Sequence, residues 1–132
     1  MHCKPFSSIL FGIWLALATA AALADRPPAN GKALSALLED VEKSHPGVIM
    51  SAEFDDRRWE LVTCASEGRS CRELSIDAIS GKELRSSSES DWGRRPPAGG
   101  KTASQVARAV EERKLGVITE MEFEQPAWEV SV

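Results

Sequence analysis

The chain has few of the residues that most catalytic and metal sites use. It holds two histidines and three cysteines among 132 residues, and His45 is the only histidine beyond residue 2. A Ser/His/Asp set would depend on His45, which follows an expected helix and precedes Pro46, and no such set is suggested. A structural zinc site usually takes four ligands, and no glycine-rich phosphate loop follows an expected strand. We predict that the protein is not an enzyme and has no metal or cofactor.

The chain also lacks an excess of positive charge. It has 16 Lys and Arg against 20 Asp and Glu, which gives a formal net charge of −4. Nucleic-acid binding gains affinity when Lys and Arg release counterions from phosphates, so nucleic acid is not an expected partner. The arginine pairs Arg57-Arg58 and Arg94-Arg95 are isolated and are predicted to be solvated loop charges.

Long apolar runs are absent apart from residues 9–24. This run follows Lys4, ends in a small-x-small pattern at Ala24 and gives way to the polar Asp25. These features are typical of a secretory signal peptide spanning residues 1–24. An uncleaved membrane anchor is the alternative, although the run is shorter than the roughly 20 residues that a span needs. We predict cleavage between Ala24 and Asp25 and a periplasmic or secreted protein with no membrane attachment after cleavage.

The chain repeats itself after 69 residues. The segment GVIMSAEFDDRRWE (47–60) returns without a gap as GVITEMEFEQPAWE (116–129), and 16 of 39 positions are identical between 25–63 and 94–132. Unrelated segments would agree at about one position in twenty, so we interpret the pattern as a duplication.

Each copy is expected to begin with a helix, because apolar residues recur at i, i+3, i+4 and i+7. Pro46-Gly47 ends the first helix, and the capping-box spacing of Thr102 and Gln105 starts the second at Thr102. The apolar positions are Leu34, Leu37, Leu38 and Val41 in the first copy, and Ala103, Val106, Ala107 and Val110 in the second.

A hairpin is expected after each helix, because apolar and polar residues alternate over residues 50–55 and again over 59–63. A four-residue loop, 55–58, would place Phe54 opposite Trp59 on one face. The second copy would likewise set Phe123 opposite Trp128, and we interpret all four aromatic residues as core.

Cys64 and Cys71 are the two cysteines that follow the expected signal peptide. An even pair in an exported chain favours a disulfide. Placing them opposite each other also puts Leu61 opposite Leu74 and Trp59 opposite Ile76, which gathers the apolar residues on one face and the cysteines on the other. A redox or metal pair is the alternative.

The order of these features resembles the PepSY domain. That family has an aromatic-Glu-Val strand and a final D-x-x-[ST]-G-[EK]-[VL] turn, matched here by Trp59-Glu60-Leu61 and by DAISGKEL at 77–84. The similarity covers residues 33–84, and 102–132 as far as the strand. It implies an α+β fold, an αβββ unit with one helix packed on a small antiparallel sheet, followed by a partial αββ repeat. It also implies an extracytoplasmic role, since the family includes inhibitory pro-segments of metalloproteases, and it supplies no catalytic residues.

We therefore divide the chain into a signal peptide (1–24), a first repeat (25–84), a Ser/Pro/Gly-rich linker (85–100) and a truncated second repeat (101–132). The second repeat lacks the third strand, the turn and the cysteines. We expect its hairpin to dock on the first repeat, by joining that sheet or sharing its core, or else to pair with another chain.

The last strand is predicted to be an open edge where a partner strand can add. Its alternating apolar residues are Trp128, Val130 and Val132. Oligomeric state is expected to be monomeric, or weakly dimeric through this strand.

Two classes of function remain from the sequence. The first is a binding or inhibitory module for an envelope protein, of which a protease is the partner that the resemblance implies. The second is a structural or small-ligand-carrying envelope protein. A weak calcium site is a further alternative to a solvated acidic face on the sheet, formed by Glu53, Asp55, Glu60, Glu73 and Asp77.

Overall fold

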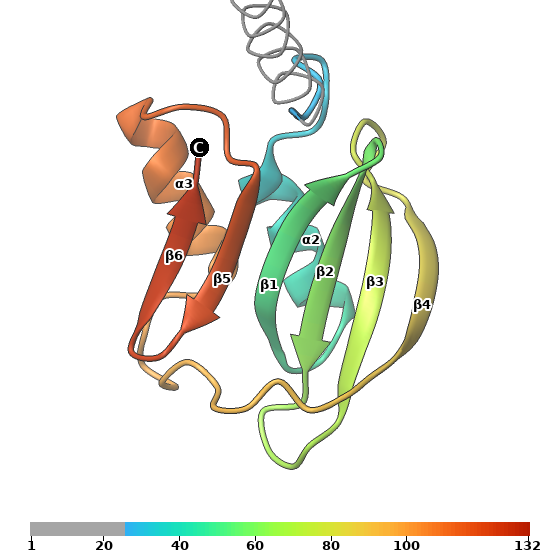
Figure 1. Cartoon of the computed structure of the whole chain (residues 1–132), viewed down its shortest axis with the longest axis vertical. Coiled ribbons are helices and arrows are strands. Elements are labelled where there is room, and N and C mark those ends of the chain that lie inside the picture. The colour runs from blue at the N-terminus through green and yellow to red at the C-terminus, as the bar shows by residue number, and fades with distance from the viewer. Residues whose placement is uncertain (1–25) are drawn as a thin grey trace, which may run out of the picture.

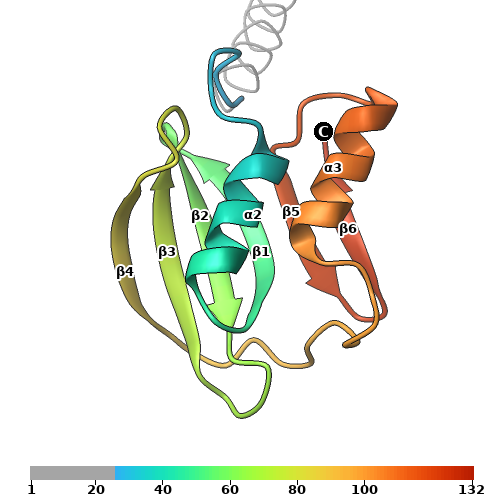
Figure 2. The same cartoon turned by 180° about the vertical axis from the view of Figure 1, so that it is seen from behind.

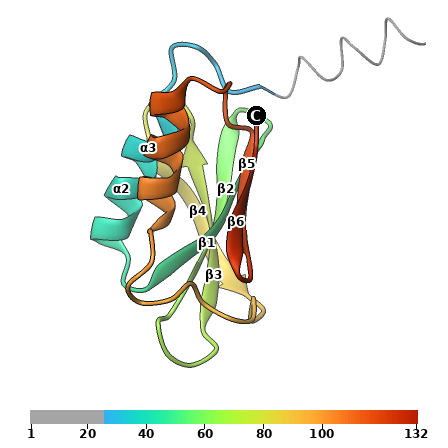
Figure 3. The same ribbon diagram turned by 90° about the vertical axis from the view of Figure 1, so that its left-hand side faces the viewer.

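Two helices pack on one face of a six-stranded antiparallel sheet, which confirms the α+β class predicted from the sequence (Figure 3). The structure, a computed structural model, describes residues 26–132. The strands run in the order β4-β3-β2-β1-β5-β6, so both repeats contribute to one sheet (Figure 1). The predicted signal peptide and its cleavage between Ala24 and Asp25 lie outside the described residues.

Helix α2 (Leu34–Ser44) forms where apolar residues recur at helical spacing, and its four predicted apolar positions are all buried. The chain then breaks at Pro46-Gly47, as expected. Gly47 has a φ of 107°, and a side chain there would collide with the backbone carbonyl of Cys64. Only glycine accepts both conditions, so this residue allows the chain to turn sharply from the helix into the sheet.

Strands β1 (Val48–Asp55) and β2 (Arg58–Cys64) form the first hairpin. The connection is shorter than the four residues expected, because the first and last of them pair with each other and only Asp56 and Arg57 lie in the turn. Both have positive φ, 50° and 66°. Such a turn matches the right-handed twist of paired strands and so favours the tighter connection.

Strand β3 (Cys71–Asp77) pairs with β2 in the predicted register. Cys64 lies opposite Cys71, Leu61 opposite Leu74 and Trp59 opposite Ile76. The strand ends at the predicted turn, where Asp77 Oδ2 accepts the backbone N–H groups of Ile79 and Ser80 at 3.1 and 2.8 Å. The hydrogen bonds from Ser80 and then from Ile79 hold the pKa of Asp77 below its usual value.

Strand β4 (Glu83–Glu89) corrects the predicted linker. Residues 85–89 pair with β3 instead of forming an open chain, so the αβββ unit gains a fourth strand. The segment is mostly polar and exposed, and it therefore carries no apolar alternation that would indicate a strand. A polar strand is nevertheless suited to the edge of a sheet, where it discourages unwanted pairing.

Arg95 corrects a second expectation, that Arg94-Arg95 is a solvated pair. Its side chain is 13% exposed and forms an ion pair with Asp91 at 3.1 Å. Its guanidinium also donates to the backbone oxygens of Ala65 and Gly68, at 2.9 and 3.1 Å. Arg95 therefore fastens the connection between the repeats to the loop that follows β2.

The second repeat contains helix α3 (Ala103–Arg113) and strands β5 (Glu120–Glu124) and β6 (Ala127–Ser131). Thr102 accepts the backbone N–H of Gln105, and the Gln105 side chain accepts the backbone N–H of Thr102. The predicted capping box therefore starts this helix.

The repeats join where β1 pairs with β5, which confirms the prediction that the second hairpin docks within the chain. Ala52 lies opposite Met121, and these residues occupy equivalent positions when the repeats are aligned. The flanking pairs are Ser51 with Glu122 and Glu53 with Glu120. Ser51 is equivalent to Glu120 and Glu53 to Glu122, so a two-fold rotation carries one pair onto the other. An approximate two-fold axis therefore passes through the Ala52–Met121 pair.

The helices repeat this symmetry in their polar contacts. They lie antiparallel and side by side (Figure 2). The Ser35 hydroxyl donates to Glu111 at 2.5 Å, and the equivalent Ser104 hydroxyl donates to Glu42 at 2.5 Å. Each glutamate also accepts the backbone N–H of its serine, at 3.1 and 3.2 Å. Each carboxylate therefore caps the N-terminal turn of the opposite helix, where negative charge is favoured.

The main core lies between these helices and the sheet and contains residues of both repeats. The aromatic pairs Phe54–Trp59 and Phe123–Trp128 both meet edge to face, with ring centroids 5.5 and 5.6 Å apart. The first pair is buried in this core, whereas Trp128 remains half-buried. A smaller apolar cluster consists of Met50, Val62, Cys64, Cys71 and Phe123, with Val48, Trp92 and Trp128 packed against it.

Candidate functional site

Strand β6 is the last strand of the sheet, as predicted (Figure 1). Of the three residues predicted to mark its edge, Trp128 and Val130 are half-buried against the main core, and Val132 follows the strand with 53% of its surface exposed. Within residues 26–132, no strand pairs with the outer side of β6. The predicted open edge is therefore present in the described part of the chain.

The two edges of the sheet differ in chemistry. Strand β4 carries mostly Ser and charged residues, and Leu84 is its only apolar side chain. Strand β6 carries Trp128 and Val130 in alternation with polar residues. Since exposed apolar edge strands favour pairing with another strand, β6 is the stronger candidate for binding.

The sheet face opposite the helices gathers acidic side chains at the seam between the repeats. Glu53 on β1 lies opposite both Glu60 on β2 and Glu120 on β5. In the next row, Glu122 on β5 lies opposite Glu129 on β6. Glu53 and Glu60 lie on this face as predicted from the sequence. The acids of the second hairpin were not predicted to join them, although Glu120, Glu122 and Glu124 alternate, which is typical of one strand face.

This crowding changes the titration of two glutamates. Partial burial, followed by the charges of Glu120, Asp55 and Glu60, raises the pKa of Glu53. Partial burial and a hydrogen bond with Glu124, followed by nearby negative charges, raise the pKa of Glu122. The negative charge of these glutamates at the seam therefore destabilises the folded state.

The five acids predicted on this face do not all gather at the seam. Asp77 uses its carboxylate in its own turn, and Glu60 accepts a hydrogen bond from Ser75 at 2.6 Å. Among residues 26–132, no group of three or more His, Cys, Asp and Glu is arranged to hold a metal ion. His45 caps the end of α2 and lies 2.8 Å from a carboxylate oxygen of Glu83, a contact that the sequence did not indicate.

Cys64 and Cys71 form the predicted disulfide across the β2–β3 hairpin, with their Cα atoms 4.0 Å apart. Both side chains are buried in the smaller apolar cluster. The Arg95 guanidinium lies 3.8 Å from the Cys71 sulfur. These contacts indicate a structural disulfide that holds the hairpin and the connection between the repeats together.

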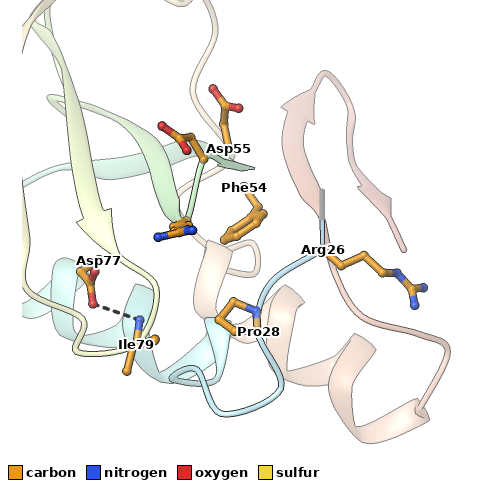
Figure 4. Close-up of a pocket in the computed structure, with 8 residues that line it drawn as sticks. Arg26, Pro28, Phe54, Asp55, Asp77 and Ile79 are labelled. Carbon is orange, nitrogen blue, oxygen red and sulfur yellow. Dashed lines mark hydrogen bonds between the residues drawn. The ribbon is translucent and has the colours of Figure 1, made fainter. Parts of the chain in front are cut away.

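A shallow hollow of about 780 Å³ lies where the β1–β2 turn, the Asp77 turn and residues 26–28 meet (Figure 4). Phe54, Pro28 and Ile79 supply its apolar surface, with charged residues around them. Asp77 lines the hollow but is hydrogen bonded to Ile79, as the dashed line in Figure 4 shows. A ligand in this hollow would therefore make mainly apolar contacts, because the Asp77 carboxylate already accepts hydrogen bonds from its own turn.

No protein-family model, no curated protein and no solved structure matches the chain. The resemblance to the PepSY domain therefore stays a prediction. None of the helices in residues 26–132 has the length and apolar character that crossing a bilayer requires.

Proposed function

We propose that the protein is an exported, non-enzymatic binding module that modulates an envelope or secreted protease by strand addition at β6. The observation that carries this proposal is the open β6 edge with its half-exposed apolar residues. Strand addition supplies affinity through backbone hydrogen bonds and specificity through alternate side chains. The resemblance of residues 33–84 to the PepSY domain supports a protease as the partner.

The test compares residues 25–132 with two proline variants. Val130→Pro removes a backbone donor at the β6 edge, whereas Ser88→Pro does so at the β4 edge. We expect the unchanged chain and Ser88→Pro to alter metalloprotease activity in an envelope fraction, and Val130→Pro to lose this effect. Unaltered protease activity with all three proteins contradicts the proposed function.

Export is tested separately by N-terminal sequencing of the protein from the cell envelope. Asp25 is the expected first residue, because the small-x-small pattern ends at Ala24. A retained Met1 contradicts cleavage and favours a membrane anchor.

The second candidate is a small-ligand-carrying or structural envelope protein. The hollow around Phe54, Pro28 and Ile79 favours this alternative, because apolar concave surfaces with a few polar groups are typical ligand sites. Mass spectrometry of the native protein under non-denaturing conditions, with a small molecule bound at one per chain, distinguishes it from the protease-binding proposal.

A further inference from the structure

Repeat 1 contains a template for a strand beside β6, a position that no strand of residues 26–132 occupies. A shift of 69 residues carries β2 onto β6, so that Trp59 corresponds to Trp128 and Leu61 to Val130. In repeat 1, β3 lies beside these positions and leaves Trp59 and Leu61 only 2% and 0% exposed. Their counterparts on β6 are half-buried. The difference in exposure marks the place that an additional strand would cover.

The helix above β6 shows the same difference. Val106 and Val110 of α3 are partly buried against the main core, as are Trp128 and Val130 of β6. Their equivalents in α2, Leu37 and Val41, are 1% and 5% exposed. These apolar residues of the helix and of the second hairpin strand are thus buried in repeat 1, whereas their equivalents in repeat 2 are only partly buried.

The backbone of β6 is oriented to accept this strand. The Phe54 N–H donates to Thr119 O, toward β5 and away from β2, so Phe54 and Trp59 form a pair that is not hydrogen bonded. Trp59 therefore directs its backbone groups to β3. Phe123 and Trp128 are the equivalent pair in repeat 2. The backbone N–H and C=O groups of Trp128 therefore point to the open edge, and those of Val130, two residues further along, do the same.

The opposite face of the strand sets the chemistry of the occupant. Glu60, the equivalent of Glu129, lies opposite Ser75 and accepts a hydrogen bond from its hydroxyl at 2.6 Å. The partner residue opposite Glu129 should likewise be a donor. Glu129 itself lies opposite Glu122 and adds to the negative charge around that residue. A cationic side chain satisfies both conditions, because it donates and also offsets this charge.

A second copy of this chain fits less well. Pairing two β6 edges would bring two acidic rows together, and like charges directly opposite each other on neighbouring strands are destabilising. The β4 edge of a second copy offers Leu84 as its only apolar side chain. A segment of different sequence, which offers a cation between apolar residues, therefore fits β6 better than a second copy does.

We infer that β6 binds, in antiparallel orientation, an extended segment of a partner protein in which a Lys or Arg lies between two apolar residues. The apolar residues take the positions of Leu74 and Ile76 opposite Val130 and Trp128, and the cation lies opposite Glu129. This inference rests on the proposed function and names the chemistry of its partner.

The test uses seven-residue peptides that alternate Val with Lys or Val with Glu, and a scrambled peptide with the Val/Lys composition. Binding to residues 25–132 is followed by NMR on the backbone amides. We expect the Val/Lys peptide to bind at least about tenfold more tightly than the Val/Glu peptide, as one charge-assisted hydrogen bond allows. The shifted amides should lie on β6, and the scrambled peptide should bind weakly.

Two substitutions make the result specific. Glu129→Lys changes an exposed side chain and should transfer the preference to the Val/Glu peptide, even if Val130→Pro proves poorly folded. Ser88→Pro should leave peptide binding unchanged. Equal binding of both charged peptides, or shifted amides confined to β4, overturns the inference. Concentration-dependent dimerisation through β6 overturns it in favour of a second copy.

The two proposals can fail separately. Peptide binding at β6 with the expected charge preference, but without any effect on protease activity, contradicts the proposed function alone. Loss of protease modulation in Val130→Pro, without a charge preference among the peptides, contradicts the partner chemistry alone.

Discussion

Individual glutamates at the seam between the repeats make folding sensitive to pH. The pKa values of Glu53 and Glu122 are raised above their ordinary value of 4.5. The folded state therefore binds more protons than the unfolded state between 4.5 and the raised values. The free energy of unfolding should rise as pH falls through this interval, and the gain should be complete once pH is below 4.5. Further acidification then removes the stability that the lowered pKa values of Glu39, Asp40 and Asp77 provide.

We predict that the protein is more stable to urea near pH 5 than at neutral pH. The groups that face Glu53 and Glu122 are Asp55, Glu60, Glu120, Glu124 and Glu129, with Arg58 4.0 Å from Glu60. The double substitution Glu53→Gln and Glu122→Gln should raise stability at neutral pH and reduce the pH dependence. Glu67→Gln, on an exposed loop, is the control. A parental protein that is most stable at neutral pH contradicts the prediction.

The disulfide is the second feature that acts through single residues. Closing the short loop between Cys64 and Cys71 should stabilise the fold by roughly 2–3 kcal/mol on the chain-entropy model. Replacing both cysteines with serine should lower the free energy of unfolding by about this amount. Urea denaturation with and without reductant measures the effect, and the double variant should not respond to reductant. Two free thiols in protein from an oxidising compartment would contradict the assignment.

At the scale of elements, the reciprocal contacts between α2 and α3 hold the repeats together beside the short β1–β5 pairing. Each joins a nearly buried serine hydroxyl to a glutamate of the opposite helix. Hydrogen bonds to charged groups contribute about 1.5–3 kcal/mol. The helix pair therefore stabilises the seam at which the acidic strands oppose each other.

We predict that Ser35→Ala destabilises the protein by about 1–2 kcal/mol, because the Glu111 carboxylate loses a donor in a partly buried site. Ser104→Ala should have a similar effect by symmetry. A double-mutant cycle with Glu111→Gln should show coupling to Ser35 and none to Ser104. Glu112→Gln, the exposed neighbour, is the matched control. Additive effects of Ser35→Ala and Glu111→Gln contradict a direct contribution of this contact.

The sequence predicted elements well where local periodicity or register decides the structure. The α2 face, the capping box at Thr102 and the β2–β3 register depend on residues close in the chain. The β4 strand was missed because its stability comes from pairing with β3 and its side chains are polar. The Ser35–Glu111 contact joins residues 76 apart, so local periodicity does not predict it. Its only sequence signal is that Ser and Glu are identical at the equivalent positions of the two repeats. The position of β6 at the sheet edge in residues 26–132 was predictable because the equivalent strand of repeat 1, β2, is followed by β3.

At the scale of the whole molecule, residues 26–132 resemble a symmetric pair of units, and within them only the first unit has the strands β3 and β4. The shared strands run β2-β1-β5-β6 across the axis, and β3 and β4 extend the sheet on one side. Ala52 and Met121 lie at the centre, and both side chains are fully buried. Their Cβ atoms should be about 4.5–5.5 Å apart, as in directly opposed antiparallel residues.

We predict that exchanging these two residues is tolerated better than changing either one. Met121→Ala alone should cost about 2–5 kcal/mol through the cavity it leaves, and Ala52→Met alone about 1–3 kcal/mol through overpacking. The double exchange keeps the total volume and should cost less than the sum of the two. Thermal unfolding of the three variants measures this, and strictly additive losses contradict size matching at the axis.

The pair at the axis also bears on how the halves of this molecule can diverge. In an assembly of two separate, identical chains, every mutation at the axis appears on both sides at once, so a methionine would have to meet a methionine. A tandem gene removes this condition and lets each half mutate independently. Ala52 and Met121 are two different residues that meet at the axis. Two identical chains, each made from a gene with one repeat, are unable to form such a pair.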